Sequence, residues 1–63
     1  MQALPLEKVF DLLGTTAVPG NPKELKALCV RLAELLDLNG EQWIRDHRQK
    51  LLDQWKNAVA PHA

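Results

Sequence analysis

Apolar residues recur at helical spacing near the beginning of the chain. Pro5 suits the first position of a helix because its missing N–H would have no partner there, and Gly14 suits a left-handed C-cap. Positions i, i+3, i+4 and i+7 between them are apolar and share one helix face. These positions are Leu6, Val9, Phe10 and Leu13. The pattern predicts a helix over about residues 5–13.

A second predicted helix follows a loop at residues 14–21. Asn21 can cap this helix, Pro22 suits its first position, and Glu24 stands three residues after Asn21 as a capping-box partner. The apolar stripe beyond them predicts a helix over about residues 22–38 that two neighbours cover. The stripe consists of Leu25, Leu28, Cys29, Leu32, Ala33, Leu35 and Leu36.

A third amphipathic segment follows Asn39-Gly40 and predicts a helix over about residues 41–59. The centre of its apolar face consists of Ile44, Leu51, Trp55 and Ala58. Its margins consist of Trp43, His47, Leu52 and Val59. Pro61 ends the helix, and we expect a frayed tail at residues 60–63. The expected fold is therefore all-α, a compact three-helix domain that spans residues 1–63.

Composition supports this fold class and limits the possible partners. Apolar residues make up 46% of the chain, as in globular domains, and Leu outnumbers the β-branched residues, which favours helices. Lys and Arg number 8, as do Asp and Glu, so the basic excess typical of nucleic-acid or anionic-membrane binding is missing. No stretch approaches the roughly 20 apolar residues of a membrane span. Because Cys29 is the only cysteine and small secreted domains usually carry disulfides, we expect a cytoplasmic protein without membrane contact.

Few side chains suit catalysis or metal binding. Cys29 and His47 could meet as a thiol–imidazole pair. Cys29 lies on an apolar stripe, however, where burial suppresses the thiolate, and no Gly-rich loop or third partner accompanies the pair. Cys29, His47 and His62 also lack the spacing of metal ligands. We therefore expect no enzyme activity, no metal and no cofactor.

A helix-turn-helix over residues 32–45 is the alternative function. Outward side chains of the predicted helix at residues 41–59 would contact DNA, with Gln42, Arg45, Arg48 and Gln49 as the candidates. Gly40 comes later after Ala33 than this motif prefers, both helices are long, and acidic residues neighbour the basic ones. A solvated helix face is the simpler interpretation, and DNA binding is kept as the alternative.

The marginal apolar residues of the third predicted helix give the leading hypothesis. A domain this small cannot bury every apolar side chain, and exposed apolar patches mark partner surfaces. Trp is also enriched in binding hot spots. The other interpretation is that Trp43 and Trp55 both fill the core. We predict a non-enzymatic module that binds another protein, or itself as a homodimer, through Trp43, His47 and Leu52.

Overall fold

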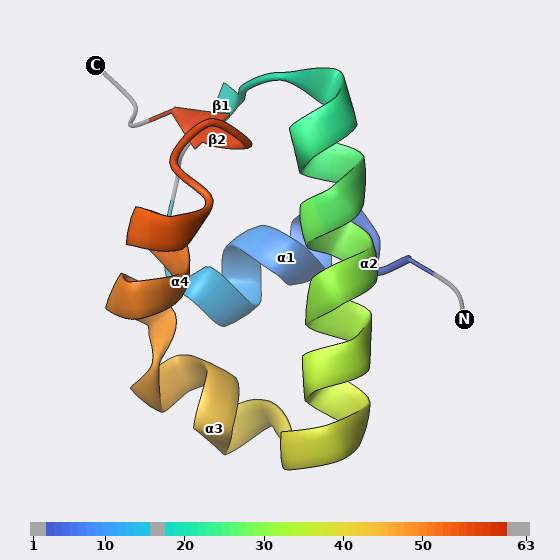
Figure 1. Cartoon of the computed structure of the whole chain (residues 1–63). Helices are drawn as coiled ribbons and strands as arrows, with labels where there is room; N and C mark the ends of the chain where they lie inside the picture. The colour runs from blue at the N-terminus through green and yellow to red at the C-terminus, as the bar shows by residue number, and fades with distance from the viewer. Residues whose placement is uncertain (1–2, 16–17, 61–63) are drawn as a thin grey trace.

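The computed structural model describes residues 3–15 and 18–60 of the chain (Figure 1). Helices dominate this part, and two short strands pair with each other. The elements are α1 (Leu6–Leu13), β1 (Val18–Pro19), α2 (Pro22–Asn39), α3 (Glu41–Asp46), α4 (Arg48–Gln54) and β2 (Val59–Ala60). The predicted all-α class is confirmed. No helix among the described residues is long and apolar enough to span a membrane.

The first helix begins and ends almost where its sequence signals indicate. Pro5 is the N-cap, one residue outside α1, and its carbonyl accepts hydrogen bonds from the amides of Lys8 and Val9. Gly14 takes the left-handed conformation, with φ 62° and ψ 36°, and its amide donates to the carbonyls of Asp11 and Phe10. This is the C-cap that Gly provides without steric cost.

The second helix confirms Asn21 as its cap, whereas the amide of Asn21, which a capping box would pair with the Glu24 side chain, donates to the carbonyl of Asn57. The side-chain oxygen of Asn21 accepts hydrogen bonds from the amides of Lys23, at 2.9 Å, and Glu24, at 3.3 Å. Pro22 occupies the first turn, where a missing N–H is tolerated. At the other end Gly40 adopts φ 88° and ψ 168°, a backbone conformation that only Gly adopts readily, and turns the chain from α2 into α3.

The third predicted helix, over residues 41–59, is corrected by the structure. His47, with φ −107° and ψ 15°, separates α3 from α4, and Trp55 ends α4. The carbonyls of Asn57 and Ala58 accept hydrogen bonds from the amides of residues 21 and 20, at 3.0 and 2.8 Å. These bonds hold residues 57 and 58 against the start of α2, and residues 59 and 60 pair with β1 instead of extending the helix.

The chain from β1 to β2 forms a ring of elements, and α1 packs across it (Figure 1). Strand β1 pairs antiparallel with β2, Val18 opposite Ala60 and Pro19 opposite Val59. The predicted loop at 14–21 thus contains a strand, and Ala60, predicted to be part of a frayed tail, is paired. Residues 61–63 of that predicted tail lie outside the described residues.

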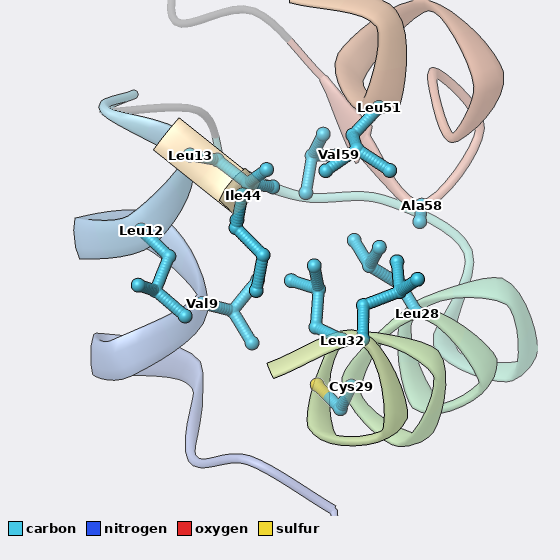
Figure 2. Packing of buried hydrophobic residues seen from close by; sticks show 11 residues of the cluster. Val9, Leu12, Leu13, Leu28, Cys29, Leu32, Ile44, Leu51, Ala58 and Val59 are labelled. Atoms are coloured by element: carbon cyan, nitrogen blue, oxygen red, sulfur yellow. The ribbon is translucent and has the colours of Figure 1, made fainter. Parts of the chain in front are cut away.

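The core fills the ring. Side chains from α1, α2, α3, α4 and β2 meet there in one apolar cluster (Figure 2). Its buried members are Val9, Leu12, Leu13, Leu28, Cys29, Leu32, Leu35, Ile44, Leu51, Ala58 and Val59. Helix α1 packs against α2, α3 and α4, whereas α2 packs against α1 and α3. Helices α2 and α4 therefore form opposite sides of the ring.

Candidate functional site

A cleft of about 220 Å³ lies between α2 and residues 41–55, here called the α3–α4 arm. Leu35 and Leu51 are buried and contribute apolar surface from the two sides. Trp43 and Trp55 are half-buried and pack against the core cluster. The complete lining is Arg31, Leu35, Trp43, His47, Lys50, Leu51, Gln54 and Trp55.

His47 is fixed against Trp43 within this cleft. The two rings stack with centroids 4.1 Å apart and planes 19° apart. His47 Nδ1 lies 2.8 Å from the carbonyl oxygen of Trp43. Because a carbonyl oxygen only accepts, Nδ1 carries the proton and donates, which leaves Nε2 as the acceptor of the neutral ring. The stack and the hydrogen bond together set the position of both rings in the cleft wall.

The lining of the cleft carries positive charge. Arg31 donates a hydrogen bond to Glu34 at 3.1 Å, and both side chains are exposed to solvent. Lys50 is exposed and forms no ion pair with any residue of the described chain. No Asp or Glu lies among the lining residues. The lining thus contains two cations, of which Lys50 is without an ion pair among the described residues, in a chain without formal net charge.

Two of the three predicted partner-binding residues come together. Trp43 and His47 both line the cleft, whereas Leu52 is half-buried, packs against the core cluster and lies outside the lining. The α2 residues Arg31 and Leu35 were missed, because only the tertiary structure brings α2 beside the α3–α4 arm. Their partners on the arm recur at roughly four-residue steps, a spacing that the sequence does show.

The two glutamines of the DNA-binding alternative are bonded to neighbouring carboxylates. Gln42 Nε2 donates to Asp46 Oδ1 at 2.9 Å within α3. Gln49 Nε2 donates to Asp53 Oδ1 at 3.2 Å within α4. The candidates therefore stand on two separate helices instead of one continuous recognition helix, which weakens the basis of this alternative.

The two arginines of that alternative are engaged as well. Arg45 donates to Glu41 at 2.7 Å and to Asp11 at 3.3 Å, and the hydrogen bond to Glu41 raises the pKa of its guanidinium. Arg48 packs over Gly14, where an added Cβ would lie 2.8 Å from Arg48 Cζ. Its Nε is buried without a hydrogen-bond partner among the described residues. DNA binding by these side chains stays an untested prediction.

Cys29 and His47 lie in different environments and do not form the thiol–imidazole pair that the sequence allows. It is 6% exposed and belongs to the core cluster, whereas His47 lines the cleft. Burial of Cys29 raises the pKa of its thiol, which disfavours the nucleophilic thiolate. In residues 3–15 and 18–60, no three His, Cys, Asp or Glu side chains gather in a group that could hold a metal ion. His62 lies outside the described residues.

No family model matches this chain, and no curated protein or solved structure was found that matches it. Its function must therefore be inferred from the cleft and from the side chains around it. Those side chains combine two half-buried indoles, two buried leucines and two cations.

Proposed function

We propose that this protein is a small non-enzymatic helical module that binds another protein through the cleft between α2 and the α3–α4 arm. The observation that carries the proposal is the pair of half-buried tryptophans, Trp43 and Trp55, in the walls of this cleft. A half-buried indole has an apolar face within reach of a partner and loses little conformational freedom on binding. Trp is accordingly among the residues most enriched in interface hot spots.

The size of the cleft supports an anchor side chain as its occupant. A volume of about 220 Å³ exceeds the roughly 150 Å³ cavity that takes up benzene. It lies below the range of about 300–1,000 Å³ that is typical of pockets for cofactors and drug-sized ligands. One bulky apolar side chain of a partner segment fits this space. The matching mode of recognition is a helix laid along a groove, with one residue inserted.

Helix α2 extends the apolar surface beyond the cleft. Leu38 is 75% exposed, and its position three residues after Leu35 places it on the same face of α2. A partner helix that inserts one side chain between the tryptophans would reach Leu38 with a residue one or two turns away. The two apolar contacts together would fix the direction of the partner segment.

Self-association and location belong to the same proposal. Two copies that met through this face would bring Lys50 and Arg31 of each chain toward those of the other, and this like-charge contact is unfavourable. We therefore propose a partner of different sequence, with a homodimer as the alternative.

We place the module in the cytoplasm, because its single cysteine, Cys29, leaves it without the internal disulfides usual in small secreted domains.

Peptide display on the immobilised protein tests the proposal. We expect enrichment of peptides whose binding is lost in Trp43→Ala and retained in Leu6→Ala, a matched truncation of a partly exposed apolar residue on α1. Circular dichroism verifies that both variants fold. If Trp43→Ala does not fold, Gln54→Trp fills the cleft from an exposed lining position and serves instead. Enriched peptides that bind the cleft variant as well as the parent protein would contradict the proposal.

A further inference from the structure

The charges around the cleft and its apolar interior are specific enough to define a class of partner. We infer that the partner is an acidic amphipathic helix, in which carboxylates flank one bulky apolar side chain that enters the cleft. This inference rests on the proposed function. The juxtaposition of Lys50 on α4 with Arg31 on α2, across Trp43 and Trp55, is the observation behind this inference.

Lys50 is available to a partner carboxylate. It is exposed and unpaired in residues 3–15 and 18–60, although Asp53 stands three residues after it on α4 and Asp46 ends α3 four residues before it. Those two carboxylates instead accept hydrogen bonds from Gln42 and Gln49. The ammonium group of Lys50 therefore has no fixed counter-charge on its own helix.

Arg31 can exchange its present partner for a new one. Its ion pair with Glu34 joins residues one turn apart on α2, and the two side chains are 51% and 39% exposed. Exposed pairs of this kind contribute little to stability, because water and ions screen them. A carboxylate from a partner, partly shielded from water by the tryptophans, offers the guanidinium a stronger bond than Glu34 does.

The interior of the cleft specifies the apolar part of the partner. Leu35 and Leu51 line the cleft together with the two indoles and are largely buried, so they contribute apolar atoms to its interior. A Leu, Phe or Trp side chain would exclude water from this surface. The cations stand on opposite sides, so carboxylates that precede and follow the inserted residue on a partner helix could reach both.

Single-stranded nucleic acid would also combine stacking with positive charge, but the structure favours a peptide. The ring of His47 already covers one face of Trp43, which leaves less indole surface for a base. Arg45 and Lys8, the basic residues near α3, both bond to Glu41. These two cations are therefore already engaged and are not available to the backbone of a nucleic acid.

Fluorescence anisotropy with three labelled probes tests the inference. The first probe is a synthetic helix of about 14 residues, roughly four turns, with one Leu face flanked by Glu. The second replaces each Glu with Lys, and the third is an oligothymidine. We expect the Glu peptide to bind most tightly, and to weaken as added salt screens the charges. Tighter binding of the Lys peptide or of the oligothymidine overturns the inference.

A charge-reversed pair of variants ties the binding to the cleft. Lys50→Glu should weaken binding of the Glu peptide about tenfold, since an attraction becomes a repulsion. Lys26→Glu makes the same charge change at an exposed α2 position outside the cleft and should leave the Kd within about twofold. Equal weakening by both variants overturns the inference. If the Glu and Lys peptides bind equally and both lose binding in Trp43→Ala, the acidic partner is wrong and the proposed function stands.

Discussion

The carbonyl oxygen of Trp43 accepts two hydrogen bonds from His47, one from its backbone amide at 3.1 Å and one from its ring Nδ1 at 2.8 Å. The same imidazole stacks on the indole of Trp43. These contacts lie at the residue where α3 ends and α4 begins. Trp55, which ends α4, lines the same cleft as the two stacked rings.

Replacement of His47 with Ala should destabilise the fold by about 1–2 kcal/mol, since it removes an aromatic stack and a side-chain hydrogen bond. Urea unfolding of the two proteins measures the difference. His47→Phe keeps an aromatic ring but no donor, so its loss should be smaller. An unchanged unfolding midpoint for His47→Ala would mean that the stack contributes nothing to the junction.

Gly40→Ala should destabilise the protein through backbone conformation. A Cβ on Gly40 would meet no heavy atom within 4 Å, so the cost comes from φ 88° and ψ 168° and amounts to about 1–3 kcal/mol. Chemical synthesis with D-alanine at this position provides the control, because D residues favour positive φ. We expect thermal unfolding to show a loss for L-alanine and little or none for D-alanine. Equal losses would contradict the assigned conformation.

Gly20→Ala should loosen the closure between β1 and β2. A Cβ on Gly20 would lie 2.6 Å from the carbonyl oxygen of Asn57 and 3.0 Å from that of Ala58, both backbone atoms. Relief of this contact requires the backbones to separate, at a cost of about 1–3 kcal/mol. Hydrogen exchange should then show faster exchange of the amides of Gly20 and Asn21, while amides within α1 are less affected. Unchanged protection of Gly20 and Asn21 would contradict the pairing.

The local parts of the fold are the parts that the sequence predicts. Asn21, Pro22 and Gly14 act within one helical turn of their own positions, so capping rules locate the ends of α1 and α2 within one residue. The pairing of Val18 with Ala60 depends on contacts between distant segments. The break at His47 shows in its backbone conformation, whereas apolar periodicity continues from residue 43 to residue 55, and so the sequence predicts one long third helix.

The candidate site likewise contains residues that the sequence predicts and residues that only the tertiary structure brings in. Trp43 and His47 are four residues apart, and a helical pattern places both at the margin of one face. Arg31 and Leu35 join them only because Gly40 turns α3 back toward α2. Leu52 was expected at the same surface, but it packs against the core cluster and lies outside the cleft lining.

Acid should destabilise the protein in part through Glu41. Hydrogen bonds from Arg45 and Lys8 lower the pKa of this carboxyl below its ordinary value of 4.5. A lowered pKa in the folded state adds stability above the unfolded pKa, and this contribution disappears as the pH falls through the folded pKa. Urea midpoints between neutral pH and the acid range should therefore fall less steeply for Glu41→Gln than for the parent protein. Asp37→Asn, which changes an exposed carboxylate on α2, should follow the parent slope.

Cys29 should react slowly with thiol reagents in the folded protein. Burial hides the thiol and raises its pKa, so both access and thiolate formation require opening of the core between α1 and α2. Labelling by a disulfide reagent should be at least about a hundredfold slower than in urea, as local opening costs a few kcal/mol. Rapid labelling in native buffer would contradict the burial.

The free energy of unfolding should fall at alkaline pH because of the same thiol. Its pKa is raised in the folded protein, so the unfolded chain loses the proton first as the pH passes the ordinary value of 9.0. Cys29→Ala should lack this decline.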